Sequence, residues 1–165
     1  MARVLIVGCG CRGSALARRL AADGYAVRGT TRDPARTAAI EAAGAEAVVA
    51  DPDRLATLVP RLAGVSAICW LLGSAEGAPE LHGARLRTLL ERLVDTPVRG
   101  VVYEAAGSVD SGLLAGGATI VRAAAYRWRI PAEVVEEDPW SHARWLAAMS
   151  AAAQRLLNPE PRKRQ

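Results

Sequence analysis

A glycine-rich hexapeptide directly after the first apolar run constrains the fold more than any other feature of the chain. The run Val4–Val7 has the composition of a strand that is buried on both faces of a parallel sheet. The hexapeptide, residues 8–13, has the spacing G-x-G-x-x-G, and a helical pattern follows at once. This order of strand, tight turn and helix is typical of a loop that holds the phosphates of a dinucleotide. The alternative is a structural glycine turn that binds no ligand.

Each glycine of the hexapeptide has its own expected role. Gly8 permits the sharp turn, Gly10 lets backbone amides approach the pyrophosphate, and Gly13 lets the helix pack close to the strand. The helix N-terminus adds free N–H groups and the positive end of its dipole. The predicted cofactor loop comprises Gly8, Cys9, Gly10, Cys11, Arg12 and Gly13.

Apolar runs and helical patterns alternate along the rest of the chain. Strands are expected at residues 25–30, 47–50, 67–72, 98–103 and 130–135. Helices are expected at residues 14–20, between Asp33 and Gly44, and at 51–59, 80–94, 110–128 and 140–157. The alternation predicts an α/β, three-layer, doubly wound Rossmann fold. Its mainly parallel six-stranded sheet has the expected order 3-2-1-4-5-6.

The chain length of 165 residues fits one domain, which we place at residues 1–158. Residues 159–165 form a basic tail that carries part of the net charge of +4. Such a tail can contact nucleic acid or an anionic membrane, but a frayed, solvated terminus is the favoured interpretation. Neither nucleic acid nor a membrane is therefore expected as a partner.

The three cysteines, Cys9, Cys11 and Cys69, indicate neither a disulfide framework nor a metal site. The two histidines, His82 and His142, supply no obvious further ligands, so no metal is expected. No signal peptide is visible, and no apolar stretch approaches the ~20 residues of a membrane span. These observations favour a cytoplasmic protein with reduced thiols.

The residues after the second expected strand distinguish two cofactors. NAD sites place an acidic residue there, which accepts hydrogen bonds from the ribose 2′-hydroxyl. Here the chain reads Thr30-Thr31-Arg32, and Asp33 is better explained as a helix N-cap. Thr31 and Arg32 could instead hold a 2′-phosphate, and Arg12 could reach the same phosphate. NADP is therefore favoured and NAD is the alternative, while each arginine could also be a solvated surface residue.

Asp51 directly follows the third expected strand, from which a side chain can reach the adenine ring or its amine. It can also serve as a helix N-cap ahead of Pro52, and the two roles are compatible. We retain Asp51 as a candidate cofactor contact.

Two segments carry a resemblance to a known family. "VLIVGCGCRGSALARRLAADGYAVRGTTRDPAR" and "GAEAVVADPDRLATLVPRLAGVSAICWLLG" resemble atypical short-chain dehydrogenase/reductases of the epimerase/dehydratase-like and NmrA-like branches. The resemblance continues more loosely through "VRGVVYEAAGSV" and "RIPAEVVEED". It implies an NAD(P)-binding groove lined by Gly8, Gly10, Arg12, Gly13, Thr31, Arg32, Asp51 and the turn Leu71-Leu72-Gly73.

The catalytic pattern of that family does not carry over to this chain. Its enzymes use a Tyr-x-x-x-Lys pair on the helix after the fifth strand, where the lysine lowers the pKa of the tyrosine. Here the residue four positions beyond Tyr126 is Ile130, and Lys163 is the only lysine in the sequence. Alanines also occupy the stretch after the fifth strand where the family has a hydroxyl group.

Substitutes for the missing pair are weak catalytic candidates. Ser108 could supply a hydroxyl group, Glu104 a base, and Tyr103 or Tyr126 a proton. The favoured interpretation is structural: Tyr103 packs at a strand end, and Tyr126 packs in the core on a helix face. Both histidines are expected in surface or capping positions, and the tryptophans in the core or an interface: Trp70, Trp128, Trp140 and Trp145.

The resemblance leaves two functions open. One is an NADP-dependent oxidoreductase or epimerase-like enzyme, and the other is a non-catalytic, NADP(H)-binding redox sensor or regulator. Extended relatives carry a further substrate domain, whereas this chain ends one helix after the sixth strand, so the substrate side is expected to be open. The final helix, with Trp145, could contact a second copy in a homodimer.

Overall fold

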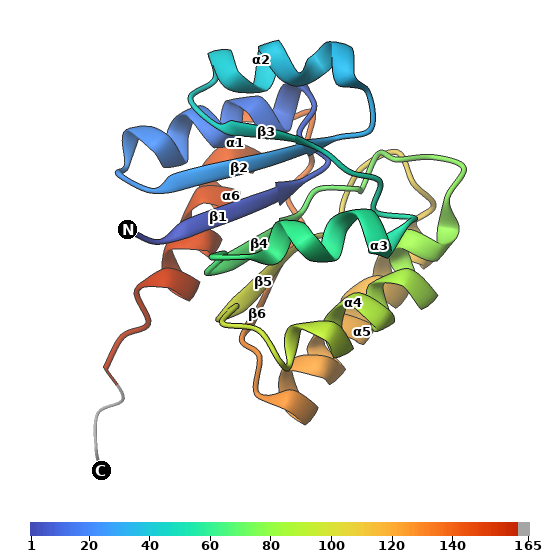
Figure 1. The fold of residues 1–165 in the computed structure, drawn as a ribbon. Coiled ribbons are helices and arrows are strands. Elements are labelled where there is room, and N and C mark those ends of the chain that lie inside the picture. Colours follow the sequence, from blue (N-terminus) through green and yellow to red (C-terminus); the bar gives the residue numbers. More distant parts are fainter. Residues whose placement is uncertain (162–165) are drawn as a thin grey trace.

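The computed structural model describes residues 1–161 and contains one six-stranded parallel sheet (Figure 1). The strand order is β3-β2-β1-β4-β5-β6, as predicted. The strands are β1 (Arg3–Val7), β2 (Ala26–Thr31), β3 (Glu46–Val49), β4 (Ala67–Trp70), β5 (Gly100–Glu104) and β6 (Ala132–Val135). The α-helices are α1 (Cys11–Ala22), α2 (Thr37–Ala42), α3 (Leu55–Leu58), α4 (Ala84–Leu93), α5 (Ser111–Trp128) and α6 (His142–Leu157). Short 3-10 helices are η1 (Pro34–Arg36), η2 (Val59–Leu62) and η3 (Pro79–His82).

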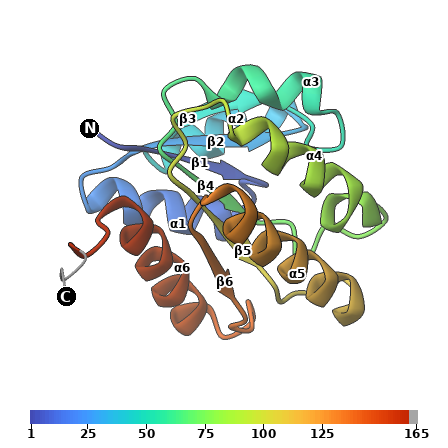
Figure 2. The same ribbon diagram turned by 90° about the horizontal axis from the view of Figure 1, so that it is seen from below.

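Helices cover both faces of the sheet, which gives the predicted three layers (Figure 2). α1, α2 and α6 pack on one face, and α3, α4 and α5 pack on the other. The alternation of side chains along β1 explains the division, because Val4 and Ile6 enter the first core while Leu5 and Val7 enter the second. All four side chains are fully buried, as the continuous apolar run predicts.

The predicted helix cap at Asp33 is confirmed, and Asp110 caps the helix that was predicted to begin there. The Asp33 carboxylate accepts a hydrogen bond from the Ala35 N–H at 2.9 Å at the start of η1. The Asp110 carboxylate likewise accepts from the Leu113 N–H at 3.2 Å and begins α5. Both carboxylates satisfy helix N–H groups that otherwise have no backbone partner.

Two other predicted helices differ from the structure, one in its start and one in its continuity. The helix expected from residue 51 begins only at Leu55, because the Asp51 carboxylate accepts from the Asp53 N–H at 3.0 Å and closes a turn instead. The helix expected at residues 80–94 is divided into η3 and α4. Gly83 separates them in a non-helical conformation (φ −137°, ψ −111°), and the His82 side chain enters the core at this break.

Several aromatic side chains lie elsewhere than the sequence pattern predicts. Tyr126, expected in the core, is 92% exposed, whereas His82, expected at the surface, is 3% exposed. Trp145 is fully buried, so the tryptophan-bearing face of α6 packs against the sheet. The expectation that this face contacts a second copy was therefore wrong. Trp140 precedes α6 and is exposed, and Trp70 is buried in β4.

No helix within residues 1–161 is long and apolar enough to cross a membrane. Among the same residues, no group of three or more His, Cys, Asp and Glu side chains converges in the manner of a metal site. The predicted basic tail begins at residue 159, and its positions 162–165 lie outside the described residues.

Candidate functional site

A groove lies at the carboxyl ends of β1, β2 and β4 and consists of two adjoining cavities. The larger has a volume of about 420 Å³ and the smaller about 180 Å³. Gly8, Gly10, Arg12 and Leu71 line both. We call this space the switch-point groove, because the connections after β1 and β4 diverge there to opposite sides, and ligands of open α/β sheets bind at such points.

The glycine loop forms the centre of the groove. Gly8 has a φ of +85°, and a Cβ atom there would lie 2.5 Å from the Leu71 carbonyl oxygen. A Cβ at Gly13 would lie 3.1 Å from the Gly8 carbonyl oxygen, so both positions need glycine for conformation or space. A Cβ at Gly10 would meet no heavy atom within 4 Å. The space beside Gly10 is therefore free for a ligand, next to the N-terminus of α1, and the loop fits a pyrophosphate.

The β2 side of the groove carries positive charge. Arg32 and Arg36 line the larger cavity and are both exposed. The Thr31 hydroxyl is engaged locally, since it accepts from the Asp33 N–H at 3.1 Å and contacts the Asp33 carbonyl at 3.3 Å. Sequence reasoning missed Arg36, which ends the short helix that the Asp33 cap begins. Its guanidinium lies 3.9 Å from the Cys11 sulfur.

Arg12 points to the opposite side of the groove. Its guanidinium donates a hydrogen bond to the Ser74 hydroxyl at 2.9 Å and lies 5.8 Å from the centroid of the Trp140 ring. Ser74 belongs to the loop after β4, and Trp140 precedes α6. This orientation separates Arg12 from Arg32, so the structure does not support the expectation that both reach one 2′-phosphate.

Glu104 lines the smaller cavity from the end of β5. It is 1% exposed, and its carboxylate accepts hydrogen bonds from the Gly73 N–H at 2.9 Å and the Trp145 indole at 2.8 Å. Burial raises the pKa of Glu104, and these two hydrogen bonds and the charge of Arg12 oppose that rise. The sequence signal for this site is a single acidic residue at the end of an otherwise apolar strand.

Tyr103, one residue earlier, lies on the opposite face of the sheet and is fully buried. Its hydroxyl lies 2.6 Å from Nδ1 of His82, and Nε2 of the same ring lies 3.0 Å from the Leu72 carbonyl oxygen. Burial raises the pKa of Tyr103 and lowers the pKa of His82. Tyr103 lines neither cavity of the groove, so its packing role, which the sequence favoured, agrees with the structure.

Nearly all predicted cofactor contacts line the groove, and Gly73 is the exception. The groove is lined by Gly8, Cys9, Gly10, Cys11, Arg12, Gly13, Thr31, Arg32, Asp51, Leu71 and Leu72. Gly73 lies behind it, where a Cβ would come within 2.1 Å of the Ala106 carbonyl oxygen. Cys9 and Cys69 are buried, which raises the pKa of their thiols to about 11 and about 12.

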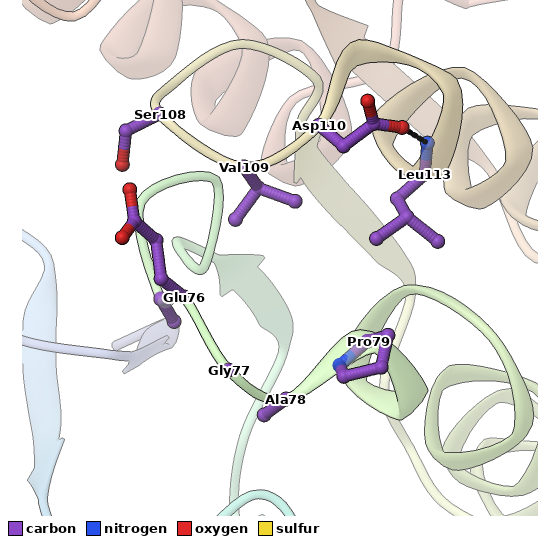
Figure 3. Close-up of a pocket in the computed structure, with 9 residues that line it drawn as sticks. Glu76, Gly77, Ala78, Pro79, Ser108, Val109, Asp110 and Leu113 are labelled. Carbon is purple, nitrogen blue, oxygen red and sulfur yellow. Dashed lines mark hydrogen bonds between the residues drawn. The ribbon is translucent and has the colours of Figure 1, made fainter.

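A third cavity of about 240 Å³ adjoins the groove at the loop after β4 (Figure 3). The side chains of Ser108 and Glu76 point towards one another at one end, and Val109 and Leu113 supply apolar surface. Two of the predicted catalytic candidates thus line a cavity: Ser108 lines this one, and Glu104 lines the smaller cavity of the groove. Tyr126 is remote, because it lies in the last turn of α5, which runs back towards the amino edge of the parallel sheet.

The comparison with protein families supplies the decisive observation. A family model described as NAD(P)H-binding matches residues 8–151, which is most of the chain. The chain belongs to this NAD(P)H-binding family. The match confirms the predicted resemblance and the nicotinamide dinucleotide class of cofactor. No curated protein matches the sequence.

Solved structures confirm the Rossmann fold of this NAD(P)H-binding chain. BdcA (YjgI) from E. coli shares 18% identity at a TM-score of 0.70, over 94% of this chain and 90% of that one. A putative NAD-dependent epimerase/dehydratase from Bacillus halodurans shares 15% at a TM-score of 0.69, over 84% and 71%. The triphenylmethane reductase of Citrobacter sp., complexed with NADP(H), shares 18% at a TM-score of 0.64 over 80% of this chain. This chain spans only about half of that reductase, 48% of its length.

Proposed function

We propose that the switch-point groove binds NADP(H) in preference to NAD(H). The observation that carries this preference is the pair Arg32 and Arg36, which line the groove beside β2 without an acidic side chain at the strand tip. The nearest acidic residue in the sequence, Asp33, already caps η1. An NAD site needs a carboxylate acceptor for the ribose hydroxyl, whereas a 2′-phosphate needs cationic donors.

The proposed placement of the dinucleotide follows the two halves of the fold. The adenosine half lies over β1–β3, with Arg32 and Arg36 at its phosphate and Asp51 at its adenine ring. The pyrophosphate lies on the loop 8–13, and the nicotinamide half lies over β4–β6, beside Leu71 and Leu72. We propose that residues 1–158 form this single binding domain.

Isothermal titration of the purified chain with NADPH and NADH tests the preference. Arg32→Ala and Arg36→Ala should each weaken NADPH binding by about tenfold and leave NADH binding within about twofold. Arg18→Ala is the matched control, because Arg18 is exposed on α1 and lines neither cavity. Equal losses for NADPH and NADH in the two variants would contradict the preference.

We further propose that the bound cofactor serves a reductase. The supporting observation is the cavity of about 240 Å³ beside the groove, which offers a substrate space with a hydroxyl at Ser108. A screen of carbonyl compounds for NADPH oxidation tests this activity. Turnover that falls in Ser108→Ala at unchanged NADPH affinity would support it.

The alternative is a non-catalytic NADP(H) sensor or regulator. One observation favours it: no tyrosine or lysine lines the groove or the adjoining cavity within the part of the chain described. The usual proton-transfer pair of short-chain dehydrogenase/reductases is thus missing where the nicotinamide half would lie. Tight NADPH binding without oxidation by any carbonyl compound would favour this alternative over the reductase.

A further inference from the structure

Glu104 is a buried carboxylate to which no cation within residues 1–161 is paired. Both of its oxygens accept hydrogen bonds, from the Gly73 amide and the Trp145 indole, but both donors are neutral. None of the salt bridges in the described chain includes it. A buried charge is costly unless a partner compensates it, and the charge of Arg12, which forms no salt bridge with Glu104, compensates this carboxylate only in part.

The Glu104 carboxylate also lines part of the proposed cofactor-binding groove. It lines the smaller cavity of the switch-point groove between the glycine loop, the proposed pyrophosphate site, and Leu71, beside which the nicotinamide half is proposed to lie. Glu104 is the last residue of β5, and thus belongs to the half of the sheet that takes the nicotinamide nucleoside in a doubly wound fold. A dinucleotide bound in the proposed placement would bring to this carboxylate the part of the cofactor whose charge changes with its oxidation state.

We propose that Glu104 makes the groove selective for the oxidised dinucleotide, because the nicotinamide ring is cationic in NADP⁺ and neutral in NADPH. This inference rests on the proposed function, since it needs a dinucleotide in the groove. It assigns Glu104 a role in discriminating the two forms of the cofactor and not in proton transfer.

The hydrogen bonds of Glu104 favour its ionised form. An ionised carboxylate is an acceptor only, which matches the two N–H donors that face it. A protonated carboxyl group would have to donate as well, and no described acceptor is bonded to it. Burial raises the pKa of Glu104, but the two hydrogen bonds and the charge of the Arg12 guanidinium, which is held by Ser74, oppose that rise.

The expected size of the effect follows from Coulomb's law. At an effective dielectric constant of about 20, the attraction between two opposite unit charges on either side of a small cavity changes an equilibrium constant by about tenfold or more. Removal of the Glu104 charge should therefore lower the ratio of the NADPH to the NADP⁺ dissociation constants by about tenfold. The same factor corresponds to a change of about 30 mV in the midpoint potential of the bound two-electron couple.

The test must remove the charge without creating a new conflict in the core. A glutamine at position 104 has one acceptor and one donor, so its amide N–H would oppose one of the two N–H groups that Glu104 now accepts. Trp145→Phe removes the indole donor and resolves this conflict. The informative comparison is thus Trp145→Phe against the double variant Glu104→Gln/Trp145→Phe, with thermal unfolding to confirm that both fold.

Isothermal titration with NADP⁺ and NADPH in mildly alkaline buffer gives the two dissociation constants for each variant. We expect Trp145→Phe to bind NADP⁺ more tightly than NADPH. In the double variant, the ratio of the NADPH to the NADP⁺ dissociation constants should be about tenfold lower than in Trp145→Phe. Glu41→Gln, which removes an exposed carboxylate on α2, should change the ratio by less than about twofold.

The outcomes separate this inference from the proposed function. If both cofactor forms bind and their ratio is the same in the two variants, the role of Glu104 is overturned while the proposed function stands. If the double variant prefers NADP⁺ more strongly, the sign of the effect is wrong and the inference is equally overturned. If the unsubstituted chain binds neither form, the proposed function fails, and the inference fails with it.

Discussion

The Tyr103 hydroxyl lies 2.6 Å from Nδ1 of His82, within the buried layer beneath the loop after β4. Since Nε2 of His82 faces the Leu72 carbonyl oxygen at 3.0 Å, the ring nitrogen at Nε2 carries the proton and donates it. Nδ1 then accepts from the tyrosine hydroxyl, and the imidazole is neutral. The two hydrogen bonds of His82, which we call the buried relay, connect Tyr103 of β5 and the end of η3 to Leu72. Leu72 lines the switch-point groove.

Tyr103→Phe should destabilise the protein, because it removes the donor to Nδ1 and leaves that buried nitrogen unpaired. We expect a loss of about 1–3 kcal/mol in the free energy of unfolding, measured by urea denaturation. Tyr126→Phe is the matched control: Tyr126 is 92% exposed, so the same change there should cost less than about 0.5 kcal/mol. Equal effects of the two substitutions would contradict the buried relay.

His82 should make the stability fall as the pH drops below 6.5. Burial holds the pKa of His82 below its ordinary value of 6.5, so the folded protein keeps the ring neutral while the unfolded chain takes up a proton. This contribution is fully present above 6.5 and is lost as the pH falls towards the folded-state pKa. The slope should approach 1.4 kcal/mol per pH unit, about the value for one proton.

The pH effect is measured as a difference, because buried Glu104, whose pKa is raised, contributes the opposite slope. His82→Gln should remove the loss of stability between about pH 6.5 and pH 5.5, relative to the unsubstituted chain. His142→Gln should leave it unchanged, since His142 is exposed at the start of α6. A slope that persists in His82→Gln would show that another group titrates.

Substitution by alanine should change the stability of the protein in opposite directions at two adjacent glycines of α5. A Cβ at Gly117 would lie 1.9 Å from the Tyr103 hydroxyl oxygen, so Gly117→Ala should cost about 1–3 kcal/mol through overpacking. A Cβ at Gly116 meets no heavy atom within 4 Å, and Gly116→Ala should stabilise the helix by about 0.5–1 kcal/mol. Thermal unfolding of both variants checks this, and destabilisation by Gly116→Ala would contradict the packing described for α5.

Substitutions at two glycines of the loop should affect different properties, one the stability of the fold and the other the binding of NADPH. Gly8→Ala should destabilise the fold, because Gly8 has a φ of +85° and its Cβ would lie against Leu71. Gly10→Ala should retain its melting temperature within a few degrees but lose about tenfold or more in NADPH affinity, since its Cβ would point into free space of the groove. Calorimetry and ligand titration on both variants measure the two effects. Unchanged NADPH affinity in Gly10→Ala would contradict the proposed placement of the pyrophosphate on this loop.

The fold was predictable because local and global signals agree along this chain. The buried run of β1, the glycine turn and the caps at Asp33 and Asp110 each depend on neighbours in the sequence. Strand order then follows from the connection rules of parallel sheets. The predicted groove residues lie together because the carboxyl ends of β1, β2 and β4 meet at one edge.

The failed predictions concern residues whose surroundings are set by distant elements. Helical spacing could not show that Tyr126 lies on the outer face of α5, or that His82 turns inward at a break before α4. Glu104 was considered only as a base, because its partner Trp145 is 41 positions away in the sequence. Arg12 was assigned to the wrong side of the groove for the same reason, since Ser74 is 62 positions away.

The switch-point groove is proposed to hold a nicotinamide dinucleotide and to prefer its 2′-phosphorylated form. Both proposals are tested by isothermal titration of the unsubstituted chain with NADPH and then with NADH. We expect saturable binding of NADPH and an affinity for NADH that is at least about tenfold weaker, because two arginines hold the additional phosphate. Equal affinities would contradict the preference, and the absence of binding for both would contradict the dinucleotide site itself.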